Sequence, residues 1–77
     1  MTEKEIKAEL KRLAKLVKKD NEIYARNKTE WSADITQKWS LPLVDLAQNT
    51  GKKRVIEWDK TYDRVLKIGV GDIVVEV

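Results

Sequence analysis

The chain has 77 residues, a formal net charge of +3, and neither cysteine nor histidine. These two absences exclude disulfide bonds, Ser-His-Asp and Cys-His catalysis, and every metal site that needs imidazole or thiolate ligands. The length predicts a single domain, residues 1–77. Such a domain buries only about 60–65% of its unfolded surface, which leaves little room for an enclosed active-site cleft.

The apolar residues give no sign of a membrane segment. No run approaches the roughly 20 consecutive apolar residues of a membrane span. The N-terminus also lacks the apolar core of a secretory signal peptide. We therefore expect a cytoplasmic protein that does not enter a membrane.

The first predicted element is a helix that begins at residue 3 and ends near Asn27. Thr2 and Glu5 have the spacing of a capping box, in which the side chain of each residue accepts a hydrogen bond from the backbone N–H of the other. Apolar residues then recur at helical spacing and define a buried stripe: Ile6, Leu10, Leu13, Val17 and Tyr24. This stripe needs a partner surface, which we expect the C-terminal strands to supply.

The opposite face of this helix is basic. Residues 1–20 carry seven cationic and four anionic side chains, so they hold the entire formal excess of +3. At about 100° per residue, five lysines fall together on this face, with Arg12 and Lys19 beside them. The five are Lys4, Lys7, Lys11, Lys15 and Lys18. Two interpretations fit them: an ordinary solvated helix face, or a surface that contacts nucleic-acid phosphates.

A second helical segment follows the connector at residues 27–32. Ser32 can cap a helix that begins at the next residue. The apolar stripe of this segment is Ile35, Trp39, Leu43 and Leu46. Pro42 removes a backbone donor and disfavours helical geometry at Leu41. The sequence therefore predicts a kink or a break near Ser40, giving one bent helix or two short ones, before Gly51 ends the segment.

A break would give residues 35–49 the outline of a helix-turn-helix motif, with the strands that follow as a wing. The second helix of that motif would carry the acidic Asp45, and only Gln48 and Asn49 could read base edges. These residues argue against sequence-specific reading of DNA by such a motif.

Three strands are predicted in the C-terminal part, at residues 55–59, 64–68 and 73–77, and the last two are joined by a tight turn within residues 69–72. Alternation places one set of side chains toward the helices: Ile56, Trp58, Leu66, Ile68, Ile73, Val75 and Val77. It places Val55, Val65 and Val74 on the opposite face. Residues 62–68 could instead form a short helix, although their β-branched residues favour a strand.

These elements predict an α+β fold class. Two or three N-terminal helices would pack on a C-terminal three-stranded antiparallel sheet, in an ααβββ order that also allows a winged-helix-like arrangement.

Two patterns that can carry chemistry are present, and neither matches its motif. Glu57, Asp59 and Asp63 lie near Lys60, but their spacing differs from that of metal-dependent nucleases, so we interpret them as exposed strand and turn charges. The glycines at 69 and 71 are not followed by the Gly-Lys-Ser/Thr of a phosphate-binding loop. We therefore expect no enzyme activity, no metal site and no cofactor.

The chain has three tryptophans and no phenylalanine. Tryptophans can be stacking platforms for single-stranded nucleic acid. Because no phenylalanine is available to fill the core, we expect Trp39 and Trp58 to lie there and Trp31 to be partly exposed.

We expect a small non-enzymatic binding protein that contacts nucleic acid. The predicted contacts are the five lysines of the helix face, Lys4, Lys7, Lys11, Lys15 and Lys18, together with Lys52, Lys53 and Arg54. The alternative is a protein-interaction module, an inhibitor or adaptor, that uses the sheet edge or the valine face. Its predicted interface is Val55, Val65, Ile73, Val74 and Val75.

The last strand also bears on the oligomeric state. It is predicted to be an edge strand that carries one charge, Glu76, and neither proline nor lysine. We therefore predict a homodimer that buries this strand or the valine face, with Val74→Lys shifting it toward monomer.

Overall fold

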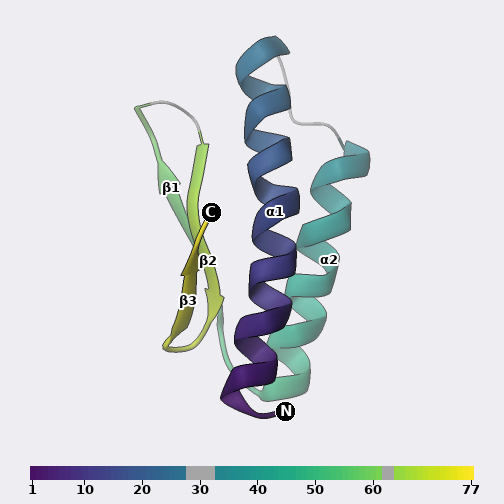
Figure 1. The fold of residues 1–77 in the computed structure, drawn as a ribbon, viewed down its shortest axis with the longest axis vertical. Helices are drawn as coiled ribbons and strands as arrows, with labels where there is room; N and C mark the ends of the chain where they lie inside the picture. The colour runs from purple at the N-terminus through teal and green to yellow at the C-terminus, as the bar shows by residue number, and fades with distance from the viewer. Residues whose placement is uncertain (28–32, 62–63) are drawn as a thin grey trace.

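The structure is a computed structural model that describes residues 1–27, 33–61 and 64–77. It contains α1 (Glu3–Asn27), α2 (Ala33–Thr50), β1 (Arg54–Asp59), β2 (Arg64–Val70) and β3 (Ile73–Glu76). The two helices form one layer and the antiparallel sheet, ordered β1-β2-β3, forms the other (Figure 1). The predicted α+β fold, with helices first and a three-stranded sheet last, is confirmed.

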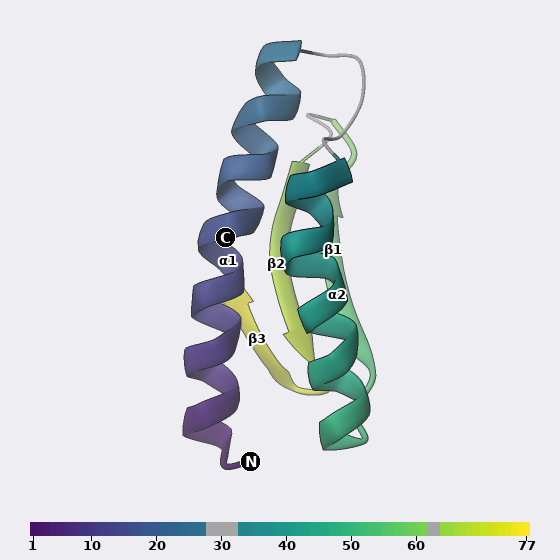
Figure 2. The ribbon, with the colours of Figure 1, turned by 90° about the vertical axis from the view of Figure 1, so that its right-hand side faces the viewer.

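Both helices cover the same face of the sheet. α1 packs on α2, β2 and β3, whereas α2 lies beside it and reaches β1 and β2 (Figure 2). The fully buried side chains between the layers include Leu10, Leu13, Leu43, Ile68 and Val70. α1 is about 37 Å long at 1.5 Å per residue, so it runs the length of a molecule that measures 38 × 23 × 17 Å. Neither helix in the described part of the chain is both long and apolar enough to cross a membrane.

The N-terminus of α1 has the predicted capping box. The Glu5 N–H donates to Thr2 Oγ1 at 3.2 Å, and the Thr2 N–H donates to Glu5 Oε1 at 3.3 Å. Two of the N–H groups that a helix start leaves without intrahelical partners are thereby satisfied. The predicted start at residue 3 and end near Asn27 are both confirmed.

α2 continues through Pro42 without a break, so the predictions of two short helices and of a helix-turn-helix within residues 35–49 are wrong. A proline inside a helix costs about 3 kcal/mol. Trp39, Leu43 and Leu46 are buried on the two sides of the proline, and each such side chain contributes about 1.5–3 kcal/mol on burial. Continuous helical packing therefore outweighs the cost. Because α2 is one helix, the sheet is not the wing of a winged helix.

α2 ends as its sequence predicts. Gly51 has a left-handed φ of 67°, the Gly51 N–H donates to the Gln48 carbonyl, and the Lys52 N–H donates to the Ala47 carbonyl at 3.1 Å. These two hydrogen bonds form a Schellman motif. The motif favours glycine at residue 51, because this position has a positive φ. The following connector is tied to the β2–β3 turn, since the Gly71 N–H donates to the Lys53 carbonyl at 2.8 Å.

A β-bulge in β2 changes which side chains face the helices. Glu57 pairs with Lys67 and Trp58 pairs with Val65, so Leu66 is an extra residue on β2. The inserted residue reverses the alternation, and Val65 is buried against the helices with 1% of its surface exposed. The prediction that Val65 lies on the outer face is therefore wrong. Leu66, predicted to point inward, is half-buried.

The core contains one of the two tryptophans assigned to it. Trp39 is 3% exposed, as predicted, but Trp58 is 46% exposed, so its assignment to the core is wrong. Trp58 lies on the edge strand β1, where α2 packs less extensively than α1 packs on β3.

The helix alternative for residues 62–68 is also wrong, because β2 begins at Arg64. Trp31, the Ser32 cap and Asp63 lie outside the described residues.

Candidate nucleic-acid interface

The structure places all five predicted lysines of α1 on its exposed side. We call Lys4, Lys7, Lys11, Lys15 and Lys18 the basic ridge; each is exposed, as are Arg12 and Lys19 beside it. The ridge exists because Ile6, Leu10 and Val17 occupy the opposite, buried side of the helix. Lys4 and Lys18 are separated by about 21 Å along the helix axis at 1.5 Å per residue.

Most of this ridge has no internal counter-charge. Lys7 Nζ lies 3.7 Å from Glu3 Oε1, an exposed pair of the kind that contributes little stability. Among the described residues, Lys4, Lys11, Lys15 and Lys18 have no carboxylate within ion-pair distance. These four ammonium groups are therefore available to an external anion.

Arg12 differs from the ridge lysines because it is paired. Its guanidinium donates two hydrogen bonds to the Glu9 carboxylate. The hydrogen bonding and positive charge of Arg12 lower the pKa of Glu9. A guanidinium held this way is less available for bidentate recognition of a phosphate or a guanine.

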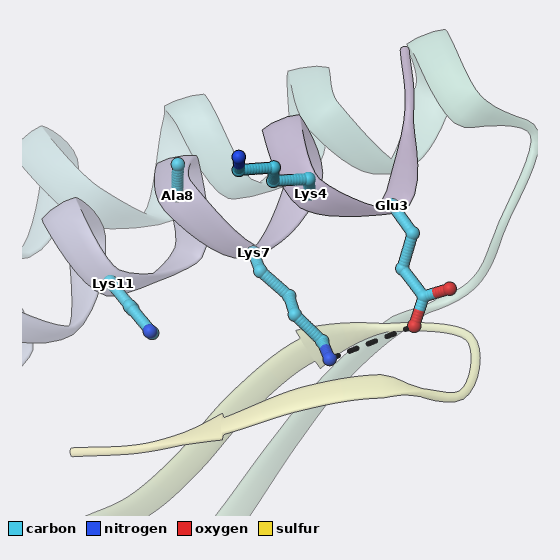
Figure 3. Close-up of a pocket in the computed structure, with 5 residues that line it drawn as sticks. All are labelled: Glu3, Lys4, Lys7, Ala8 and Lys11. Carbon is cyan, nitrogen blue, oxygen red and sulfur yellow. Dashed lines mark ion pairs between the residues drawn. The ribbon is translucent and has the colours of Figure 1, made fainter.

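A shallow depression lies on the N-terminal half of the ridge. It has a volume of 610 Å³ and is lined by Glu3, Lys4, Lys7, Ala8 and Lys11, all from α1. Figure 3 shows the Lys7 side chain reaching toward Glu3, with Lys11 leaving the helix on the same side and Lys4 pointing in another direction. Three lysines around a shallow surface can contact several phosphates of an extended polyanion.

The second predicted group of cations lies elsewhere. Lys52, Lys53 and Arg54, the basic cluster, are exposed in the α2–β1 connection and at the start of β1. Lys52 and Arg54 line a depression of 540 Å³ with Val44, Ala47, Gln48 and Gly51, on the α2 side of the molecule. The ridge lies on α1, over the opposite edge of the sheet (Figure 2). The structure therefore divides the predicted basic residues between two surfaces.

The residues predicted for a protein interface are also divided. Val55 and Val74 lie on the outer face of the sheet, flanking Gly69, and Val74 is 39% exposed. Ile73 and Val75 are half-buried and pack against the core, whereas Val65 is fully inside it. The predicted valine face is thus reduced to two residues.

Asp20 is a buried polar residue that is not among the predicted site residues. It is 0% exposed, and its Oδ2 accepts hydrogen bonds from Trp39 Nε1 at 2.9 Å and from Thr36 Oγ1 at 2.7 Å. Its Oδ1 has no hydrogen-bond partner among the described residues. The sequence could have predicted this burial, because Asp20 falls on the apolar stripe of the helix, seven residues after Leu13. Asp20 joins α1 to α2.

Asn21, the next residue, joins α1 to the sheet. Its side-chain amide donates to the Val65 carbonyl at 2.9 Å and accepts from the Val65 N–H at 3.0 Å. β3 ends at Glu76, and the Val77 N–H donates to the Leu66 carbonyl. The Asn21 amide therefore replaces a strand residue beside Val65 and fixes which side of α1 faces the sheet.

The acidic residues near the β1–β2 turn are partly paired. Asp59 Oδ2 lies 3.4 Å from Arg64 Nε and its Oδ1 accepts from the Thr61 N–H. Within residues 1–27, 33–61 and 64–77, no group of three or more acidic, histidine or cysteine residues could hold a metal ion.

Comparisons of the chain with protein families, with curated protein sequences and with solved structures find no match.

Proposed function

We propose that this chain is a small cytoplasmic, non-enzymatic protein that binds double-stranded nucleic acid through the basic ridge of α1. One observation carries the proposal: Lys4, Lys11, Lys15 and Lys18 are exposed on one side of a continuous helix and have no carboxylate partner in the described part of the chain. Phosphate neutralisation by lysine releases condensed counterions and supplies most of non-specific nucleic-acid affinity.

The spacing of the ridge favours a duplex over a single strand. A duplex presents one phosphate charge per about 1.7 Å of its axis, twice the density of either strand alone. Over the roughly 21 Å from Lys4 to Lys18, the ridge can therefore find a phosphate near each lysine. Single-strand binding usually adds aromatic stacking platforms, and residues 1–23 contain no aromatic side chain.

The side-chain types also favour contacts to the phosphates over contacts to the bases. Sequence reading in the major groove relies on bidentate arginine, asparagine and glutamine. The five ridge positions are all lysine, and the neighbouring Arg12 is held by Glu9. We therefore expect binding without sequence preference and with a strong dependence on salt.

The test compares two triple variants that remove the same charge. Lys11→Gln, Lys15→Gln and Lys18→Gln together neutralise the ridge, whereas Lys52→Gln, Lys53→Gln and Arg54→Gln neutralise the basic cluster. Binding of a labelled mixed-sequence duplex is measured by fluorescence anisotropy at low salt. The ridge variant should bind at least about tenfold more weakly than the cluster variant. Equal losses in the two variants, or no loss in the ridge variant, would refute the ridge as the interface.

A further inference from the structure

β3 leaves a row of backbone hydrogen-bonding groups without a strand partner. The sheet order makes β3 an edge strand in the part of the chain that the structure describes. Val70 pairs with Ile73 across the β2–β3 turn, and the Val77 N–H donates to the Leu66 carbonyl. In an antiparallel ladder the bonded residues alternate. Ile73 and Val75 therefore bond to β2, whereas the N–H and C=O groups of Val74 and Glu76 point away from the sheet.

Lysines of α1 stand beside this edge. Lys18 and Val77 line the same depression, which has a volume of 370 Å³. Lys18 is three residues before Asn21, whose amide bonds to β2 and so marks the sheet side of α1. Lys7 and Lys11 share a side of the helix with Lys18 at helical spacing. We call Lys7, Lys11 and Lys18 the edge lysines.

A strand added at this edge would have two different faces. Its side chains would alternate, with one set in the helix layer beside the edge lysines and the other set on the outer face beside Val74. Acidic side chains complement the first environment, because opposite charges attract and like charges repel across such short distances. β-Branched side chains suit the second. The fitting partner is an extended segment in which acidic and β-branched residues alternate.

A second copy of the chain fits this edge less well. β3 of a second copy would present Ile73 and Val75 toward the edge lysines, and its own α1 would bring a second set of lysines into the same layer. Charged residues beside an edge strand are a known means by which proteins prevent pairing of identical edges. Here the guarding lysines lie on the neighbouring helix, and β3 itself carries one charge, Glu76.

We propose that the outer edge of β3 accepts an extended acidic segment of a partner protein as a fourth antiparallel strand. Backbone bonds to Val74 and Glu76 supply the pairing, and the edge lysines select acidic side chains. This site differs from the proposed duplex interface, because it requires the backbone of β3.

The probe is a synthetic peptide of about eight residues that alternates glutamate with threonine. A matched peptide has lysine in place of each glutamate. Wild-type protein should bind the glutamate peptide at least about tenfold more tightly than the lysine peptide. Changing all three edge lysines to glutamate should reverse that preference. Equal affinity for both peptides, or no binding of either, would overturn the proposal.

The backbone requirement is tested with Val74→Pro, which removes an outward-facing N–H that β2 does not use. Val74→Thr is the control, since it keeps the N–H and the branched shape. Val74→Pro should lose peptide binding and keep duplex binding, whereas Val74→Thr should keep both. Peptide binding that survives Val74→Pro would refute strand addition, whereas wild-type protein that binds the glutamate peptide but not the duplex would refute only the proposed function.

A third measurement does not depend on the folding of any variant. In wild-type protein, the glutamate peptide should slow hydrogen exchange at the Val74 and Glu76 amides. Unchanged exchange with bound peptide would contradict the proposal. A dimer in sedimentation at micromolar concentration that dissociates on Val74→Lys would also contradict it, because the edge would then belong to a second copy.

Discussion

The hydrogen bond between Trp39 and Asp20 should contribute measurably to stability. The indole N–H of Trp39, 3% exposed, donates at 2.9 Å to a carboxylate oxygen of Asp20, 0% exposed. A hydrogen bond to a charged group contributes about 1.5–3 kcal/mol, and a buried charge that loses a donor has no water to replace it. Trp39→Phe removes this donor and keeps an aromatic ring in the core.

The expected loss is large relative to the stability of so small a domain. For 77 residues the free energy of unfolding is about 4–12 kcal/mol. A loss of about 1.5–3 kcal/mol should lower Tm by roughly 10 °C, since each kcal/mol shifts Tm by about 4–8 °C in a domain of this size. Unfolding is followed by far-UV circular dichroism, because the substitution itself alters tryptophan fluorescence.

A double-mutant cycle separates the hydrogen bond from the change in ring size. Trp39→Phe is measured in the wild type and in an Asp20→Ala background, where the indole N–H has no carboxylate to bond. The loss of unfolding free energy caused by Trp39→Phe should differ between these two backgrounds by about 1.5–3 kcal/mol. Thr36→Val supplies a second cycle with Asp20 if Asp20→Ala combined with Trp39→Phe does not fold. Coupling below about 0.5 kcal/mol in both cycles would refute the inference that Asp20 links the two helices energetically.

The backbone N–H of Thr2, and to a smaller extent its hydroxyl, donate hydrogen bonds to Glu5 and lower the pKa of this carboxyl group. The Glu5 carboxylate therefore stabilises the fold fully above its unfolded pKa of about 4.3. This stabilisation is lost as the pH falls through the lower folded pKa. Urea unfolding should show that Glu5→Gln is less stable than wild type at pH 7 and that the difference shrinks toward pH 3; a difference independent of pH would contradict the linkage. Gly69→Ala should destabilise by about 2 kcal/mol or more, because its Cβ would lie 2.4 Å from a backbone oxygen of β3. Thermal unfolding equal to that of wild type would show that β3 can shift to admit a methyl group.

The helix and strand pattern could be predicted because local sequence determines it strongly. The capping box at Thr2, the glycine at the end of α2 and the runs of β-branched residues each act over a few residues. Pro42 shows the limit of such reasoning. Its local cost is fixed, but whether the helix breaks depends on the core contacts on both sides of it, which only the assembled fold supplies.

The sheet faces were less predictable, because a bulge reverses alternation and leaves no clear mark in the sequence. Leu66 is an ordinary strand residue, yet its insertion opposite β1 moved Val65 into the core. The basic ridge could be predicted because helical geometry alone places its lysines together. A count of charges along the sequence could not predict that Lys52 lies away from the ridge, because this separation depends on how α1 and α2 pack.

The salt dependence of duplex binding tests the proposed function most directly. The affinity of wild-type protein for a mixed-sequence duplex is measured across a salt gradient, beside the Lys11→Gln, Lys15→Gln and Lys18→Gln triple variant. If the four unpaired lysines each contact a phosphate, log affinity should fall against log salt with a slope of about −3.6, and the triple variant should have a slope shallower by about 2.7. A wild-type slope shallower than about −1, or the same slope in both proteins, would show that the basic ridge does not bind nucleic acid.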